Sequence, residues 1–393
     1  MLPRANPLLA AVAAPPIAEA HGWIAGRTFP ADKPLIDLCQ AVPGYPPPDE
    51  LTGHLASRIG EPAMARYTEI LGLPELRTAL AEDAGAFYGT VIDPAEVAIT
   101  AGCNQAYCLA LMALAQAGDE VILPLPYYFN HQMWLDMLGV RAVHLPFRPE
   151  RGGVPDPAEA AGLIGPRTRA IVLVSPNNPT GAVYPAASIA AFFQLARDRG
   201  IALVLDETYR DFLPGAEPPH RLFDEPGWAD TLVHLYSFSK VYCLTGYRVG
   251  AALCSAPLAA EIAKAMDCVS ICAPRIGQEA ALYGIRRLGA WRAEKRRLMG
   301  ERLGALTRAL TRNSTGYELV SAGAYFAYLR HPFGAEPGID VARRLAAEQN
   351  LLCLPGSMFG PGQEGYLRFA FANVEASVME EVAARLAASA PGT

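Results

Sequence analysis

A lysine, two serines and an arginine stand close together in one part of the sequence. Lys240 follows an apolar run, 231–236, that we expect to form a buried strand. Burial disfavours the charged amine, which lowers the pKa of a lysine and makes it a better nucleophile. Ser237, Ser239 and Arg248 offer hydrogen-bond donors that suit a phosphate. The segment therefore favours a nucleophilic amine beside a phosphate site, although a lysine in a polar loop is more often a surface residue.

An amine next to a phosphate site indicates a particular cofactor. Pyridoxal 5′-phosphate carries an aldehyde that forms a Schiff base with an amine, and a phosphate that needs hydrogen-bond donors. Lys240 would provide the amine, so we expect this cofactor if other segments supply the remaining groups that it requires.

Two further turns follow expected strands and carry polar groups. Gly102 lets the backbone come close to a ligand, and the N–H groups of Cys103 and Asn104 face outward at the start of an expected helix. Asn178 lies in the segment 175–181, Ser-Pro-Asn-Asn-Pro-Thr-Gly, whose prolines and glycine fix the loop. Each turn has a simpler explanation, tight packing in the first and an ordinary asparagine turn in the second. Together they predict an anion site and a rigidly held amide.

Asp206 stands at the end of another apolar run, 201–205. A buried carboxylate must be paired or hydrogen-bonded, because an isolated buried charge is too costly. A protonated pyridine nitrogen would be a suitable partner, and the pair would let the ring accept electrons from a substrate. The alternative is an aspartate that only caps the following turn.

The elements that would position these groups alternate along the chain. Continuous apolar runs are typical of strands that are covered on both faces of a mostly parallel sheet, and longer amphipathic stretches between them predict helices. We expect strands at 97–100, 121–123, 170–174, 201–205, 232–236 and 249–253, and helices at 104–117, 129–138, 185–199 and 257–266.

The pattern changes after about residue 285. We expect a long helix at 286–311, strands at 317–320, 324–329, 351–354 and 366–371, and helices at 340–349 and 374–388. The sequence therefore predicts an α/β fold: a three-layer αβα large domain with a mostly parallel mixed sheet, and a smaller α+β domain. The expected divisions are an N-terminal arm that contributes to the small domain, 1–45, the cofactor-binding large domain, 46–284, and the small C-terminal domain, 285–393.

Four motifs occur in the order of one known family. The segment around Lys240, Asn178-Pro-Thr-Gly, Asp206-Glu-x-Tyr209 and Tyr366-x-Arg368 resemble the class I/II aminotransferases, which are fold-type I enzymes that use pyridoxal phosphate. The resemblance covers residues 35–371, nearly the whole chain.

The resemblance implies a role for each residue near the cofactor ring. Lys240 would hold the cofactor as a Schiff base and then shuttle the substrate proton, and Asp206 would pair with the pyridine nitrogen. Asn178 and Tyr209 would hydrogen-bond the 3-oxygen of the ring, and Tyr128 would stack on it. Catalysis is thereby assigned to Lys240, Asp206 and Tyr209.

Further roles implied by the resemblance concern the phosphate, the substrate and a second subunit. His131 would stand behind Asp206, Arg368 would bind the substrate α-carboxylate, and Tyr67 would reach the phosphate site of a partner subunit. We therefore expect a homodimer with shared active sites. The residues expected around the phosphate are Gly102, Cys103, Asn104, Ser237, Ser239 and Arg248.

The chain departs from the family pattern at two places. Ala41, next to Val42, stands where members commonly have a glycine near the substrate carboxylate. Arg275 stands where small hydroxyl residues are frequent, close to the neighbouring subunit's cofactor. We expect Ala41, Val42 and Asn178 to contribute to substrate binding and Arg275 to line the partner's site, with a surface arginine as the alternative for Arg275.

Composition excludes several classes of protein. The 393 residues carry 33 Lys+Arg against 39 Asp+Glu, a balance that offers no basic surface for nucleic acid or an anionic membrane. Eight scattered cysteines without a Cys-x-x-Cys pair favour reduced thiols over disulfides or a metal site. The N-terminus faintly resembles a secretory signal, but Pro15 and Pro16 interrupt it, so we expect a short helix or arm and a cytoplasmic protein without a membrane span.

The resemblance to the class I/II aminotransferases implies a ping-pong enzyme that transfers an amino group from an L-amino acid to a 2-oxo acid. An alternative is an enzyme of the same fold that performs elimination, replacement or cyclisation at the β- or γ-carbon. A transcriptional regulator is disfavoured, because the chain before residue 41 is too short for a winged helix and a linker. The substrate stays open between an aromatic one, bound by Tyr45, Tyr67, Tyr127, Phe129 and Trp134, and an acidic one, bound by Arg275.

Overall fold

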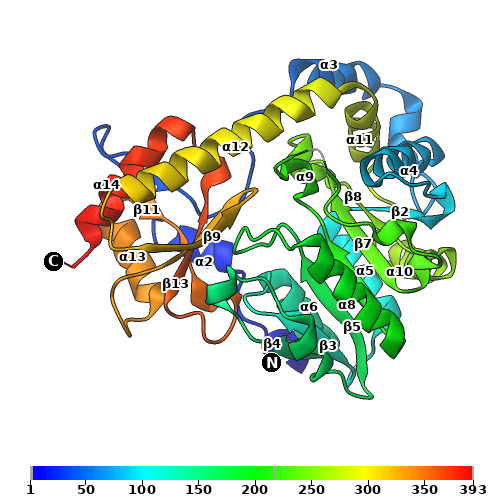
Figure 1. The fold of residues 1–393 in the computed structure, drawn as a ribbon. Helices are drawn as coiled ribbons and strands as arrows, with labels where there is room; N and C mark the ends of the chain where they lie inside the picture. Colours follow the sequence, from blue (N-terminus) through cyan, green and yellow to red (C-terminus); the bar gives the residue numbers. More distant parts are fainter. Residues whose placement is uncertain (1–2, 216, 392–393) are drawn as a thin grey trace.

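The computed structural model describes residues 3–215 and 217–391. The first two residues of the expected N-terminal arm, one position of the expected large domain and the last two of the small domain lie outside this description. The chain forms a large α/β part and a smaller C-terminal part that lie side by side and are joined by one long helix, α12 (Gly289–Arg312) (Figure 1).

The large part is built on a seven-stranded sheet in the order β2-β8-β7-β6-β5-β3-β4. β8 is antiparallel to both of its neighbours and the other pairings are parallel, so the expected mixed, mostly parallel sheet is confirmed. The strands are β2 (Val97–Thr100), β3 (Glu120–Pro124), β4 (Arg141–Leu145), β5 (Thr168–Val174), β6 (Ala202–Asp206), β7 (Leu232–Ser237) and β8 (Gly250–Leu253).

Neighbouring residues along the central strands face opposite layers of helices. Ile171 and Leu203 pack into one core with α4, α8 and α11. Val172 and Val204 pack into another with α5, α6 and α10. Because both faces are covered, the strands are apolar throughout rather than alternating, and the three-layer architecture is confirmed. These helices are α4 (Pro74–Tyr88), α5 (Cys103–Leu114), α6 (Phe129–Leu138), α8 (Ala186–Arg199), α10 (Ala256–Ser270) and α11 (Arg275–Arg287).

The smaller part contains a four-stranded antiparallel sheet in the order β12-β13-β10-β9. A separate parallel pair joins β1 near the N-terminus to β11, so the N-terminal segment is attached to the C-terminal part. The strands are β1 (Ile36–Asp37), β9 (Glu318–Gly323), β10 (Phe326–Arg330), β11 (Leu351–Leu352), β12 (Leu354–Pro355) and β13 (Tyr366–Ala370). The helices that share its core are α12, α13 (Gly338–Gln349) and α14 (Met379–Ser389).

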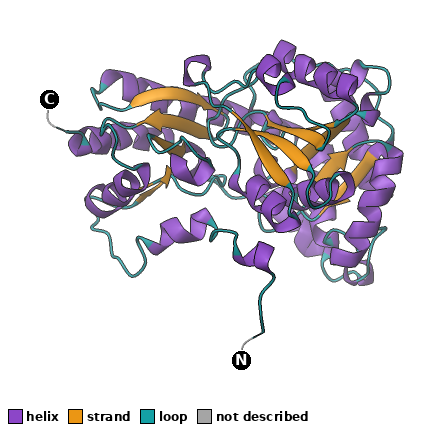
Figure 2. Ribbon diagram, turned by 90° about the horizontal axis from the view of Figure 1, so that it is seen from below, coloured by secondary structure: helices purple, strands orange, loops and turns teal. Residues whose placement is uncertain are grey.

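Short helices complete the chain. Figure 2 shows that the N-terminal helices lie at the periphery of the molecule, where Ala20 of α2 packs against Leu352 and Leu354 of the small part. No helix in residues 3–215 or 217–391 is both long and apolar enough to cross a membrane. The remaining helices are α1 (Pro7–Ala10), α2 (Pro16–Gly22), α3 (Asp49–Arg58), α7 (Pro157–Ala161) and α9 (Phe238–Val241).

The structure differs from the sequence-based expectation in several elements, and helices α3, α4, α7 and α11 were not expected. β4 was not expected, because this edge strand is only partly buried and lacks a continuous apolar run. The long helix expected at 286–311 begins only at Gly289 as α12, because residues 286 and 287 end α11. The strand expected at 351–354 breaks at Cys353 to serve two sheets. The last helix begins only at Met379, after a short 3₁₀ turn. Since α11 ends at Arg287, we propose that the domain boundary lies between α11 and α12 rather than at 284/285.

Candidate active site

Lys240 lies in the short helix α9, directly after β7. Its amine donates a hydrogen bond to the backbone carbonyl of Ala41, which brings the N-terminal segment over the end of the sheet. Burial, and to a smaller extent the positive charges of Arg248 and Arg368, lower the pKa of Lys240 to about 8. A large fraction of this amine is therefore neutral at pH values near 8, as a nucleophile or a base requires.

An anion cradle lies at the start of α5. Gly102 caps this helix with φ +86°, and a Cβ added there would lie 2.3 Å from Nη2 of Arg248. A glycine is therefore needed for the guanidinium to approach the turn. Arg248 donates hydrogen bonds to the carbonyls of Thr245 at 3.0 Å and Ala101 at 3.4 Å, which hold its charge beside the first N–H groups of α5.

Two serines complete this cradle from the other side. The Oγ of Ser237 caps α9 by accepting a hydrogen bond from the backbone N–H of Ser239 at 3.2 Å. Both side chains line the same cavity as Cys103 and Asn104 of α5. Hydroxyls, helix N–H groups and a guanidinium are the donors that a phosphate monoester dianion needs.

Asp206 ends β6 and lines the same cavity. Its Oδ1 accepts a hydrogen bond from the backbone N–H of Thr208 at 2.9 Å, and its Oδ2 lies 3.6 Å from Nε2 of His131. The ring of Tyr107 stacks on His131 with the ring centroids 3.9 Å apart. The carboxylate is thus held in one orientation by groups behind it and still lines the cavity.

Two tyrosines also line the cavity. Tyr128 lines the cavity just before α6, and its hydroxyl accepts a hydrogen bond from Nδ2 of Asn130 at 2.9 Å. Burial raises the pKa of the Tyr128 hydroxyl to about 12. Tyr209 also lines the cavity, and burial raises the pKa of its hydroxyl well above the usual value. Both phenols therefore stay protonated and act as hydrogen-bond donors at neutral pH.

Arg368 approaches the cavity from β13 of the small sheet. Its Nη1 donates a hydrogen bond to Oδ1 of Asn178 at 3.1 Å, and its Nη2 donates to the carbonyl of Cys39. The side chain is only 2 % exposed, and its Nε has no hydrogen-bond partner in the described residues. A buried guanidinium without an acidic partner in the described part of the chain is well suited to an anionic ligand.

The structure therefore gathers most of the expected residues around a single cavity of about 210 Å³. Gly102, Ala41 and Arg368 contact the residues that line it. The expected residues that line the cavity are Val42, Cys103, Asn104, Tyr128, Asn178, Asp206, Tyr209, Ser237, Ser239, Lys240 and Arg248.

Two expected residues lie elsewhere. Tyr67 is 72 % exposed and does not line the cavity of its own chain, and Arg275 begins α11. Both belong to segments that the side chain of Gln278 joins, since its amide donates hydrogen bonds to Thr68 at 3.0 Å and to the carbonyl of Ala273 at 2.8 Å. This outer face is where a second subunit would have to bind if either residue is to reach an active site.

Sequence reasoning missed some residues that line the cavity. Thr208 stands inside the Asp-Glu-Thr-Tyr motif, so its position after Asp206 could have indicated it. Gln40, Val174 and Thr245 carry no comparable signal, because they line the cavity only through the path of the chain.

The residues present fit pyridoxal phosphate. The cavity offers a lysine with a lowered pKa, a carboxylate, and a cationic cradle that a Cβ at Gly102 would fill. These are the groups that the aldehyde, the pyridine nitrogen and the phosphate of this cofactor require.

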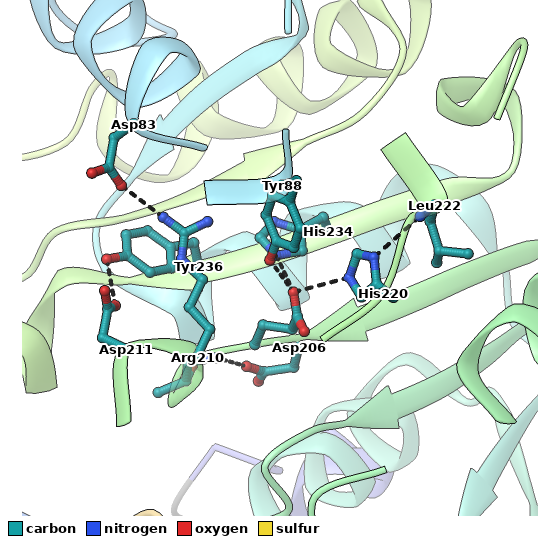
Figure 3. Close-up of polar contacts among 11 residues, drawn as sticks. Asp83, Tyr88, Asp206, Arg210, Asp211, His220, Leu222, His234 and Tyr236 are labelled. Atoms are coloured by element: carbon teal, nitrogen blue, oxygen red, sulfur yellow. Dashed lines mark hydrogen bonds and ion pairs between the residues drawn. The ribbon is translucent and has the colours of Figure 1, made fainter. Parts of the chain in front are cut away.

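A buried polar cluster lies on the far side of the Asp206 strand end (Figure 3). One carboxylate oxygen of Glu207 has Tyr88, His234 at 2.9 Å and His220 at 3.2 Å as hydrogen-bond partners. Burial by itself would raise the pKa of Glu207, but its two histidine partners hold that pKa well below the usual range. The cluster satisfies a buried charge and fixes the backbone that carries Asp206.

Comparisons with known proteins agree with this geometry. Residues 33–386 match the family described as Aminotransferase class I and II. The chain is 29 % identical to an aromatic aminotransferase, ISS1, of Arabidopsis thaliana, over 93 % of this chain and 96 % of that protein. It is 32 % identical to an aspartate/prephenate aminotransferase of Thermus thermophilus, over 87 % of each. The solved structure of aspartate aminotransferase from Thermus thermophilus with maleate superposes with a TM-score of 0.89 at 27 % identity, covering 99 % of this chain and 100 % of that one.

Proposed function

Because this chain belongs to the aminotransferase class I and II family and is an aminotransferase, we propose that its cavity holds pyridoxal 5′-phosphate on Lys240 and transfers an amino group from an L-amino acid to a 2-oxo acid. The observation that carries this proposal is the convergence of Lys240, Asp206 and Arg368 on a single cavity and its wall. One group accepts the proton, one supports the cofactor ring and one binds the substrate.

Pyridoxal phosphate, when bound, supplies an electron sink for the negative charge that remains on the substrate α-carbon after proton loss. Asp206 would pair with the pyridine nitrogen and keep it protonated, with His131 fixing the carboxylate from behind. Asn178 and Tyr209 would hydrogen-bond the 3-oxygen, and Tyr128 would stack on the ring. The phosphate would lie against Arg248, the two serines of the cradle and the first turn of α5.

Lys240 acts as the base in this proposal. Its Nζ takes the proton from the substrate α-carbon, and a pKa of about 8 leaves enough neutral amine for this step near neutral pH. The hydrogen bond to the carbonyl of Ala41 holds the amine next to the segment that contains Ala41 and Val42. The alanine at this position therefore takes part through its backbone, and Val42 lines the cavity next to it.

Arg368 decides the orientation of the substrate. Its guanidinium binds the α-carboxylate with Asn178 beside it, so the bond from the α-carbon to hydrogen faces Lys240. A planar guanidinium suits a carboxylate because it donates two parallel hydrogen bonds.

A single-turnover experiment tests the reaction type. Holoenzyme mixed with an excess of amino acid and no 2-oxo acid should release one 2-oxo acid per active site and then stop, because the amino group stays on the enzyme. A screen of aromatic and acidic amino acids in this format also identifies the donor. An enzyme that eliminates at the β- or γ-carbon would instead release ammonia continuously, and that result would overturn the proposal. The curated relatives, named as aminotransferases, support the first outcome.

We further propose a cytoplasmic homodimer with shared active sites. Tyr67 is exposed, and Gln278 links the neighbouring Thr68 to the segment before α11. This position supports a contribution of Tyr67 to the phosphate site of a second copy. Arg275 would add a positive charge to that same neighbouring site. Sedimentation of the holoenzyme would test the dimer, and a monomer with full activity would contradict it.

A further inference from the structure

Three side chains that can bind a metal lie close together where the N-terminal segment pairs with β11 of the smaller part. His21 lies in the last turn of α2, Asp37 ends β1, and Cys39 follows two residues later. One ligand atom from each residue lies within 4.8 Å of a ligand atom of the other two. Among the described residues, this is the group of three metal-ligating side chains that come so close together. The sequence alone does not predict this site, because His21 lies 18 residues before Cys39.

We propose that His21, Asp37 and Cys39 form a binding site for a divalent zinc ion, with water as the fourth ligand. Imidazole, carboxylate and thiolate are all zinc ligands, and a tetrahedral site with three protein ligands leaves one position open. Bond lengths of about 2.0–2.3 Å place the ligand atoms of such a site roughly 3.3–3.8 Å apart. Nε2 of His21 already lies 3.4 Å from Oδ2 of Asp37, and the sulfur of Cys39 lies within 4.8 Å of a ligand atom of each.

Exposure and ligand charge suit an ion at this place. The side chains of His21 and Asp37 are 42 % and 39 % exposed, which gives the ion a path from solvent, whereas Cys39 is fully buried beneath them. The ion would replace the proton of the Cys39 thiol, which passes to water, and one thiolate plus one carboxylate would balance its two positive charges.

The backbone around the site is already organised. Oδ1 of Asp37 accepts a hydrogen bond from the backbone N–H of Cys39 at 2.8 Å, so Oδ2 is the oxygen left for the ion. The carbonyl of Cys39 also accepts a hydrogen bond from Arg368. A zinc ion would therefore connect helix α2 to the segment that positions Arg368 at the wall of the substrate cavity.

The test is metal binding by the purified holoenzyme, independent of catalysis. Zinc is titrated in competition with a chromophoric chelator, and Co²⁺ is added separately as a spectroscopic probe. We expect one zinc ion per chain and, with cobalt, the intense visible absorption of a tetrahedral site together with a thiolate charge-transfer band. Cys39→Ser should remove the charge-transfer band, and His21→Gln should weaken zinc binding at least tenfold.

The controls separate this site from other thiols. Cys268→Ser removes an exposed cysteine and should leave the stoichiometry and the cobalt spectrum unchanged. His21→Gln changes a half-exposed side chain, so it keeps the test decisive if Cys39→Ser fails to fold. Equal zinc affinity in the wild type and His21→Gln, or a cobalt spectrum without a thiolate band, would show only an ion pair between His21 and Asp37 and would overturn the proposal.

Discussion

Arg368 donates a hydrogen bond to Asn178 at 3.1 Å, although the two residues lie 190 positions apart, the first in β13 and the second in the loop after β5. This bond joins the small sheet to a loop at the end of β5 and places a guanidinium at the cavity wall. The carboxylate of a substrate would therefore be bound where the large part and the smaller part of the chain meet. Substrate binding would depend on how these two parts are positioned relative to each other.

Replacement of Arg368 by lysine should weaken substrate binding while the cofactor stays bound. A lysine keeps the charge but loses the two parallel hydrogen bonds, so we expect the KM for the amino donor to rise roughly 10–100-fold, as the loss of a charged hydrogen bond implies. Steady-state kinetics and the cofactor spectrum measure the two effects. Arg330→Lys, an exposed change on the adjacent strand β10, is the matched control. Unchanged KM in Arg368→Lys would contradict the role.

Removal of the Lys240 amine should abolish turnover. We expect Lys240→Ala to lower kcat by at least about 10²–10⁴, the range that a general base contributes, while cofactor still binds without a covalent link. Borohydride reduction followed by peptide mapping would locate the covalent link at Lys240 in the wild type. Lys264→Ala, an exposed change on α10, should behave as the wild type. Substantial residual transamination by Lys240→Ala would refute the central assignment.

The stability of the cofactor-free protein should rise between about pH 8 and pH 10 because of Lys240. Its pKa is lowered from 10.5 to about 8 in the folded chain, so in this window the unfolded state binds more protons and each rise in pH favours the folded state. The contribution is on the order of 2 kcal/mol, since one pKa unit corresponds to about 1.4 kcal/mol.

Urea unfolding of the cofactor-free wild type and of Lys240→Met at several pH values measures this contribution. Methionine keeps the apolar stem and does not titrate, so the difference between the two proteins isolates the amine. A difference that stays constant from pH 8 to pH 10 would mean that Lys240 titrates at its ordinary value.

Gly102→Ala should weaken cofactor binding through Arg248. The added Cβ would lie 2.3 Å from Nη2 of Arg248 and would push the guanidinium away from the phosphate cradle. We expect the cofactor dissociation constant to rise roughly tenfold, which corresponds to about 1.4 kcal/mol. Gly118→Ala is the control, because Gly118 has nearly the same φ, +87°, and no atom within 4 Å of the added Cβ. If both variants lose affinity equally, backbone strain rather than Arg248 is the cause.

Arg275→Ala should change the kinetics of a neighbouring subunit's site. If Arg275 lines that site, its loss raises the KM for an acidic substrate or the cofactor dissociation constant, because a positive charge near an anion is removed. Arg286→Ala, an exposed change near the end of the same helix, tests the general effect of charge. Cofactor affinity and substrate kinetics that both match the wild type would leave Arg275 as a surface residue.

Much of the fold could be predicted because the sheet is covered on both faces. A strand buried on two sides must be apolar at every position, so β2, β5, β6 and β7 are visible as continuous runs. β4 lies at the sheet edge and is only partly buried, so its sequence, Arg-Ala-Val-His-Leu, carries no such run. Helix α11 was equally hidden, because its buried residues include Gln278, Glu279 and two glycines instead of an apolar stripe.

The sequence by itself determined which chemistry is present: a lysine after a buried strand, an aspartate at a strand end and a glycine before a helix are local features that follow from burial and backbone geometry. Only the tertiary structure decided how these groups act together. It brought Ala41 onto Lys240, placed Arg368 beside Asn178 and surrounded Glu207 with His220 and His234. Such contacts join segments far apart in the chain, and the packing of whole sheets and helices, rather than any local pattern, sets their distances.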